Sequence, residues 1–335
     1  MSLATVTPTP RPSPSMASRL TRYVVGRLVA AVLVLLVVTV LVFMFVHVAP
    51  SGPEDAIAGA TATQEQRDRI RATYGLDQPL VNQYLSYLGS LIQLDFGHSY
   101  IRRTPTLESI SGAAAISVPL LLCSWALAMS LGMVLGVLTA SRPGSWADRL
   151  VIGATTVGAS APAFAVGTLM AWLFGIRLGW LPVLGAGEAG WDRVLHLVLP
   201  VATSSVFALA SCTRFTRVRV GEILDEDQMT FALGRGLGRG WILRNVVLRN
   251  SGVQLVTLAG GIMISLVAGQ IVVEQVFNLR GIGSLMVESI HDQDIPMVQA
   301  ITLFVALFVV VVNLVADLAC FAIDPRLRAG LGGDR

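Results

Sequence analysis

Long apolar stretches separated by short charged segments dominate the pattern along this 335-residue chain. Six stretches come close to the length of about 20 mainly apolar residues that a helix needs to cross a bilayer. The fourth is the weakest, because Pro200 and a group of Ser and Thr residues interrupt it. The pattern predicts an all-α integral membrane protein whose six transmembrane helices lie at 24–48, 113–140, 151–176, 194–212, 253–273 and 297–323.

The composition excludes a water-soluble domain of this size. Hydrophobic residues make up 54% of the chain and charged residues only 13%, with a mean hydropathy of +0.69. A soluble domain carries about 25% charged residues, because water must wet its surface. Lipid must therefore cover much of the surface of this chain.

Every basic side chain is an arginine, and the positions of these arginines predict the orientation of the chain. They gather before the first stretch and after the second, fourth and sixth, whereas the short loops on the other side hold only Arg177, Arg193 and Arg280. Since positive side chains favour the cytoplasmic side, both termini are expected in the cytoplasm, with the chain in the inner or plasma membrane.

The absence of lysine excludes one class of function. A P-loop needs its lysine on the nucleotide phosphates, so this chain alone cannot be a P-loop ATPase. The histidines lie far apart and offer no metal site, and Cys123, Cys212 and Cys320 are expected to be small buried apolar residues. If nucleotide hydrolysis drives this protein, another subunit must supply it.

The segment after the first apolar stretch has helical signals of its own. Thr63 and Gln66 form a capping box, Gly75 ends the helix that follows, and Pro79 opens a second helix. A lid on the membrane domain and a docking surface for an external partner both fit these helices. We expect a disordered cytoplasmic tail at 1–20, a first span at 21–48 and a helical extracytoplasmic insertion at 49–112. A transmembrane domain at 113–328, which contains a cytoplasmic loop at 213–252, and a second cytoplasmic tail at 329–335 should follow.

The cytoplasmic loop at 213–252 carries the most informative pattern. Asp225, Glu226 and Asp227 are suited to the start of a short helix at 228–233, because acidic residues satisfy its free N–H groups. Alternating glycines and arginines follow, and no strand precedes them, which argues against a dinucleotide site. Two interpretations remain open: a basic patch on anionic lipid, or a coupling helix that fits a groove of a partner.

A motif within this loop resembles the signature loop of ABC-importer permeases, which reads Glu-Ala-Ala, three residues and then Gly. This chain lacks the initial Glu-Ala, and Gln254 stands where many relatives have proline. The resemblance implies that contact with an ATPase is made by the matching positions and their neighbours, namely Glu226, Asp227, Met229, Thr230, Phe231, Ala232, Arg235, Gly236 and Leu237.

Further motifs resemble the B-type permease of the dipeptide, oligopeptide and nickel branch of these importers, although Arg280 replaces a frequent proline. The matches run in order from Arg22 to Arg328 and include Tyr74-Gly75-Leu76-Asp77-Gln78-Pro79, Asp95-Phe96-Gly97, Glu274, Gly281, Gly283, Asp294, Pro296 and Asp324-Pro325-Arg326. The resemblance implies the type I ABC importer permease fold and transport by alternating access.

The resemblance also implies the partners. These are a homologous second permease, two cytoplasmic ABC ATPase subunits or one fused ATPase, an extracytoplasmic substrate-binding protein and the lipid bilayer, without nucleic acid. This chain would carry no cofactor, because ATP and magnesium belong to the ATPases. Relatives handle dipeptides, oligopeptides, nickel chelates and glutathione-like molecules, and selectivity is expected to rest with the binding protein and the second permease.

A few residues in the predicted spans, or between the fifth and the sixth, are candidates for gating or helix packing. Glu274 ends the fifth span and, with Gly281 and Gly283, is suited to a gate or to helix packing. Asn313 and Asp317 share one face of the sixth span, and a carboxylate at this depth needs a partner, for which an arginine near the cytoplasmic end is expected. The pair Gly132 and Gly136 predicts close helix contact.

Two other classes of function were weighed. A self-contained secondary transporter of small polar solutes predicts inverted repeats and ionisable residues at the midplane of the membrane, and neither is evident. A membrane enzyme needs a catalytic cluster near one membrane face, and the sequence offers none at a suitable spacing. The permease subunit of an ATP-driven importer of peptides or similar small solutes is therefore the main hypothesis.

Overall fold

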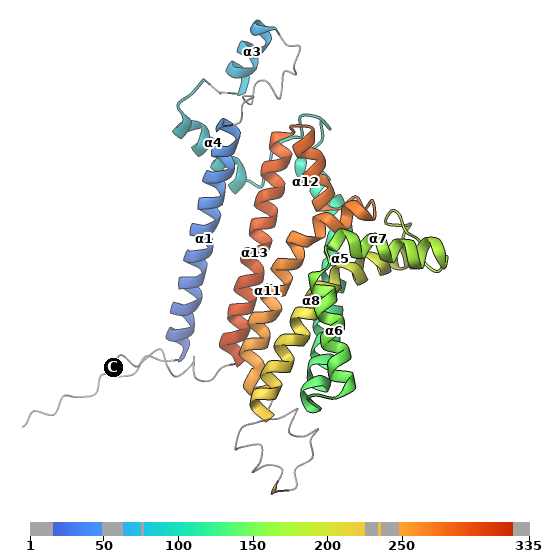
Figure 1. The fold of residues 1–335 in the computed structure, drawn as a ribbon. Coiled ribbons are helices and arrows are strands. Elements are labelled where there is room, and N and C mark those ends of the chain that lie inside the picture. The colour runs from blue at the N-terminus through green and yellow to red at the C-terminus, as the bar shows by residue number, and fades with distance from the viewer. Residues whose placement is uncertain (1–15, 49–62, 75–76, 225–233, 236–247, 324–335) are drawn as a thin grey trace, which may run out of the picture.

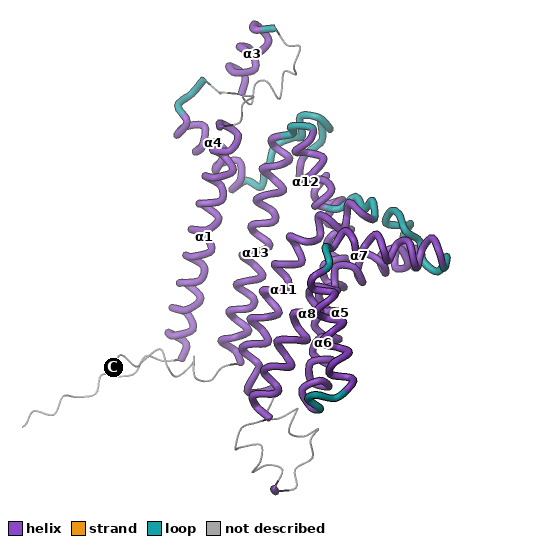
Figure 2. The backbone as a smooth tube through the Cα atoms, viewed as in Figure 1, coloured by secondary structure: helices purple, strands orange, loops and turns teal. Residues whose placement is uncertain are grey.

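The computed structural model describes residues 16–48, 63–74, 77–224, 234–235 and 248–323. Regular secondary structure in these ranges is entirely helical, apart from one isolated bridge between His98 and Pro105 (Figure 2). The predicted all-α fold is confirmed. In chain order the helices are α1 (Met16–Val48), α3 (Gln64–Tyr74), α4 (Leu80–Ile92), α5 (Thr106–Ser141), α6 (Trp146–Ser160), α7 (Ala163–Met170), the π-helix η1 (Ala171–Arg177), α8 (Trp191–Leu224), α11 (Leu248–Val276), α12 (Ile282–His291) and α13 (Ile295–Ile323).

Five of these helices, α1, α5, α8, α11 and α13, are each long and apolar enough to cross a membrane. They correspond to the first, second, fourth, fifth and sixth predicted spans. The helix α8 continues through Pro200, the residue that made the fourth span the weakest prediction. Most of their apolar surface is exposed, for example Val29, Leu33 and Val37 on one side of α1, as lipid-facing helices require.

The third predicted span, 151–176, is wrong as a continuous helix. The chain instead forms α6 and then α7 with η1, and the two parts meet at an angle of 109°. Pro162 explains the break, because the residue before a proline is pushed out of the helical conformation and Ala161 is indeed extended, with ψ of 132°. Figure 1 shows α7 running sideways out of the bundle.

The first helix begins at Met16, so the segment expected as a tail at 1–20 gives its last residues to α1. At the other end of α1 lies the inserted helix α4, where the Thr39 and Tyr84 hydroxyl groups are 2.9 Å apart and the rings of Phe43 and Tyr84 pack edge to face. We call this end of the bundle the insertion end. The opposite end, where α8 ends at Leu224 and α11 begins at Leu248, is the loop end (Figure 1).

The predicted capping box of the insertion is confirmed. The Thr63 amide donates to Gln66 Oε1 at 2.9 Å, and the Gln66 amide donates back to Thr63 Oγ1 at 3.4 Å. The helix α3 follows directly, and the predicted stop at Gly75 lies outside the described residues. The second inserted helix, α4, begins after Pro79 as expected.

The core of the bundle is the contact between α5 and α8, which the pair of glycines predicted. A Cβ on Gly132 would lie 2.7 Å from that of Cys212, and one on Gly136 would lie 2.5 Å from that of Thr216. Backbones can approach this closely only without side chains, so the close helix contact is confirmed. The predicted burial holds for Cys212 and in part for Cys320, but Cys123 is exposed, because it falls on an outward side of α5 where a thiol can face lipid.

Candidate functional site

A fully buried carboxylate organises the junction of three helices near the insertion end. Glu274, in the last turn of α11, has no exposed surface, and Ser117 of α5 donates to its Oε1 at 2.6 Å. Gln270 donates to the same oxygen at 3.2 Å, and the Ser284 amide of α12 donates to Oε2 at 2.9 Å. Burying a carboxylate in the membrane is costly unless it is hydrogen-bonded, and these three donors provide that compensation.

Ser117 makes this junction a connected network rather than a set of separate bonds. Its hydroxyl donates to Glu274 and accepts from the Ile282 amide at 2.7 Å, while its carbonyl accepts from Gln270 at 2.8 Å. One serine of α5 is thereby bonded to the end of α11 and to the start of α12. We call the residues Ser117, Gln270, Glu274, Gly281 and Gly283 the Glu274 hub.

Two of the predicted glycines belong to this hub because nothing larger fits beside the carboxylate. A Cβ on Gly281 would overlap the Glu274 carboxylate and the Ser117 hydroxyl. A Cβ on Gly283 would lie 2.7 Å from the Ile271 backbone. The structure therefore places Glu274, Gly281 and Gly283 in one cluster, as candidates for gating or for helix packing.

The hub has the geometry of a hinge. The chain changes direction between the end of α11 and the start of α12, with Asn278 in a left-handed conformation at φ 50° and Phe277 and Leu279 inserted into the core. A cavity of about 340 Å³ adjoins the hub, and its wall is mostly apolar apart from hub residues. A network of this kind can hold the two helices in one arrangement or, when its bonds exchange, allow another.

The other pair of candidates, Asn313 and Asp317, lies in α13 toward the loop end and outside the hub. Asp317 accepts from Arg27 of α1 at 2.8 Å, and Tyr23 stacks on Phe321 one turn away, with ring centroids 5.3 Å apart. The expected pairing of this carboxylate with an arginine is confirmed. Asn313 is exposed at the surface of α13. The ion pair joins α1 to α13, the helix against which α1 packs.

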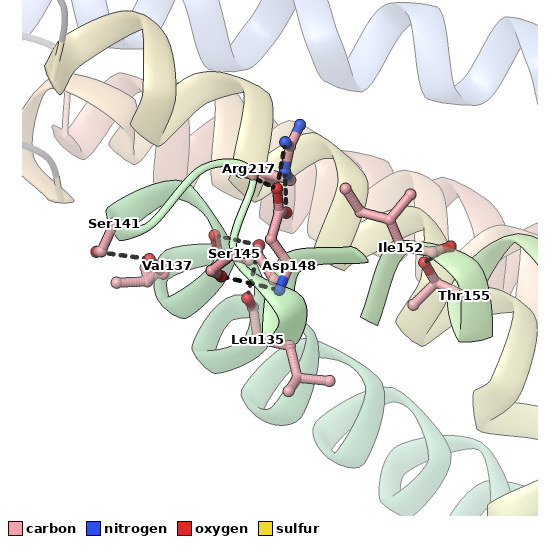
Figure 3. Close-up of polar contacts among 11 residues, drawn as sticks. Leu135, Val137, Ser141, Ser145, Asp148, Ile152, Thr155 and Arg217 are labelled. Atoms are coloured by element: carbon pink, nitrogen blue, oxygen red, sulfur yellow. Dashed lines mark hydrogen bonds and ion pairs between the residues drawn. The ribbon is translucent and has the colours of Figure 1, made fainter. Parts of the chain in front are cut away.

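A second ion pair, which the sequence did not indicate, lies at the loop end (Figure 3). Arg217 of α8 donates from Nε and Nη2 to the two oxygens of Asp148 at 2.8 and 3.0 Å. The Asp148 side chain is only 4% exposed and also accepts from the Gly144 amide, while its own amide donates to Ser145, the N-cap of α6. This bidentate pair fixes the start of α6 to the last turns of α8.

The predicted ATPase-coupling residues Glu226, Asp227, Met229, Thr230, Phe231, Ala232, Gly236 and Leu237 lie outside the described residues. Of that set the structure describes Arg235. The helices on either side of the segment are described, and they place its two ends: α8 leaves the bundle at the loop end and α11 re-enters there (Figure 1). Within the described ranges, no group of three His, Cys, Asp or Glu side chains could hold a metal ion.

The fold defines a class: a multi-span helical membrane protein, with five long apolar helices and one bent pair in the described part of the chain. Residues 132–329 match the family described as binding-protein-dependent transport system inner membrane component, and residues 20–110 match its N-terminal family. The chain belongs to this family and is the permease subunit of an ABC importer. Nothing in these comparisons supports the alternative of a self-contained secondary transporter.

Curated relatives cover nearly the whole chain. The glutathione transport system permease protein GsiC of Escherichia coli K12 is 37% identical over 309 residues, which cover 92% of this chain and 99% of that protein. The protein of the same name from Shigella flexneri serotype 5b matches with the same identity and coverage. The match includes both the inserted helices and the transmembrane domain.

Proposed function

We propose that this chain and a homologous second permease form the translocation pathway of an importer for short peptides or similar small solutes. The relatives named for glutathione transport support this class of substrate, since glutathione is itself a modified tripeptide. ATP is hydrolysed in separate cytoplasmic subunits, and a binding protein delivers the substrate from outside. The arginine distribution supports placing both termini and the loop end in the cytoplasm.

The observation that carries this proposal is the course of α11. This helix begins at Leu248, after the predicted coupling residues Glu226 to Leu237 along the chain, and reaches the hub carboxylate Glu274 without a break. Its 29 residues span about 43 Å at 1.5 Å per residue. A rigid helix of this length can carry a displacement from the loop end to the hinge at the insertion end.

The ion pair of Asp148 and Arg217 supplies a second connection. The helix α8 enters the predicted coupling segment from the other side, and this pair ties its last turns to α6. A movement of the segment thereby acts on α6 through α8 and on the hub through α11. Transport requires contacts that differ between two states, and these two connections are suited to that task.

The test is ATP-driven uptake of labelled tripeptide by proteoliposomes that contain the two permeases, the ATPases and the binding protein. We expect Gly236→Tyr to abolish uptake while the complex still assembles, because a bulky side chain prevents close approach of the ATPase. The control is Gly221→Tyr on α8, where an added Cβ meets nothing within 4 Å. Undiminished uptake after deletion of residues 230–237 overturns the proposal.

A further inference from the structure

A polar cavity opens at the insertion end, apart from the Glu274 hub. Its walls come from α4, from the loop at 95–105 and from the first turn of α13, where Pro296 and Gln299 face it. Its volume is about 700 Å³, which lies within the range of small-molecule sites. In the proposed orientation this cavity faces the outside of the cell, where substrate arrives.

The loop that forms one wall is held in place by buried bonds. Asp294, at the start of α13, is 2% exposed and accepts hydrogen bonds from the Ser99 hydroxyl and from the Tyr100 amide. Arg102 forms an ion pair with Glu288 of α12 at 2.7 Å. The loop is therefore pre-organised against α12 and α13, and a ligand would lose little affinity to ordering it.

The cavity wall carries one acidic and one basic side chain that could meet opposite charges of a ligand. Asp95 and Arg103 both line the cavity, and neither forms an ion pair within the described residues. Asp95 accepts one bond from the Gly97 amide through Oδ1, which orients its carboxylate. These two groups on one concave wall match a small molecule that carries a positive and a negative group.

We propose that this cavity is a binding site for the zwitterionic backbone of a short peptide, with Asp95 at its amino group and Arg103 at its carboxylate. Phe96 and Tyr100 also line the cavity and supply apolar contacts for side chains. This site rests on the proposed function, because it assigns a receiving position to the transported solute. A concave wall with opposite charges suits a small ligand better than it suits the surface of a binding protein.

The test is equilibrium binding of radiolabelled trialanine to the assembled complex in nanodiscs, without the binding protein. We expect Asp95→Asn and Arg103→Gln each to weaken binding about tenfold. Asn can still accept from the Gly97 amide, so the loop is kept. The exposed residues Asp292 and Arg177, which do not line the cavity, provide the matched controls Asp292→Asn and Arg177→Gln, which leave affinity unchanged.

A second ligand separates charge recognition from general adsorption. N-acetyl-trialanine amide lacks both charges and should bind the native complex more weakly than trialanine binds either the Asp95→Asn or the Arg103→Gln variant. Equal affinity for both peptides, or unchanged trialanine affinity in the Asp95→Asn and Arg103→Gln variants, overturns the site. The site is also overturned if the Asp95→Asn and Arg103→Gln variants no longer bind the binding protein but keep their affinity for trialanine. Failure of the native complex to show ATP-driven uptake overturns the proposed function instead, so the two failures are distinguishable.

Discussion

Replacing Gly281 with alanine tests the role of the Glu274 hub, because the substitution adds only one methyl group. Gly281 precedes α12 with φ of −93° and ψ of −174°, which any residue can adopt, so Gly281→Ala introduces no backbone strain. The new Cβ overlaps the Glu274 carboxylate and the Ser117 hydroxyl. Neither of these groups can retreat cheaply, because each is bonded to the other and to α12.

The expected destabilisation follows from this geometry. Forcing a methyl group into a packed site costs about 1–3 kcal/mol. Loss of the hydrogen bond between Ser117 and Glu274 adds about 1 kcal/mol, so Gly281→Ala should cost about 2–4 kcal/mol of stability. The matched control is Gly269→Ala within α11, where the added Cβ meets nothing within 4 Å. That alanine should stabilise the helix by about 0.5–1 kcal/mol.

Two measurements on the assembled complex test this pair of variants: thermal unfolding in detergent and ATP-driven tripeptide uptake in proteoliposomes. Gly281→Ala should lower the unfolding temperature and slow uptake, while Gly269→Ala should do neither. If both alanine variants leave the unfolding temperature and the uptake rate unchanged, the close packing at the hub contributes to neither stability nor transport. That result would refute the assignment of the hub as a hinge.

Three further perturbations test the other contacts. Asp148→Asn and Arg217→Gln should each lower the stability of the protein by about 3 kcal/mol, which is near the low end for buried ion pairs because Arg217 is 31% exposed. In a double-mutant cycle measured by thermal unfolding, the double variant should lose less stability than the sum of the two single variants. Arg27→Gln and Asp317→Asn should each cost at most about 1 kcal/mol and, if α1 depends on this pair, should speed proteolysis of α1 in detergent. Gly136→Leu should separate α5 from α8 and prevent a sharp unfolding transition, which unchanged melting would contradict.

The apolar pattern predicted most of the spans because a helix that crosses a bilayer needs a long run of apolar residues, which is visible in the sequence. It was wrong for 151–176, where apolar length was weighed above the local effect of Pro162 on the residue before it. Residues 151–176 are apolar enough for a membrane along their whole length, so hydropathy alone gave no sign of the 109° bend. The backbone conformation of Ala161 decides the path of this part of the chain.

The hub residues were predicted one at a time, and their hydrogen-bond partners were not. Glu274, Gly281 and Gly283 stood out as polar or glycine positions at a span end, but Ser117 lies 157 residues from Glu274 and sits inside an apolar stretch. A single serine there also fits ordinary helix packing. Asp148 and Arg217 are 69 residues apart and meet only because α6 packs against α8. Tertiary packing, which one sequence does not display, selects these pairs.

The hydrogen bonds and ion pairs between the helices share one physical role, because the helices are surrounded by lipid rather than water. Lipid is as apolar as leucine, so helices in a membrane gain little from hiding apolar side chains from it, and close packing with polar bonds decides which helices meet. Here Asp148 bonds α6 to α8, Asp317 bonds α13 to α1, and Glu274 bonds α11 to α5 and α12. A few discrete bonds, unlike a continuous apolar core, can exchange partners without unfolding the helices, and a permease that alternates between two arrangements requires that property.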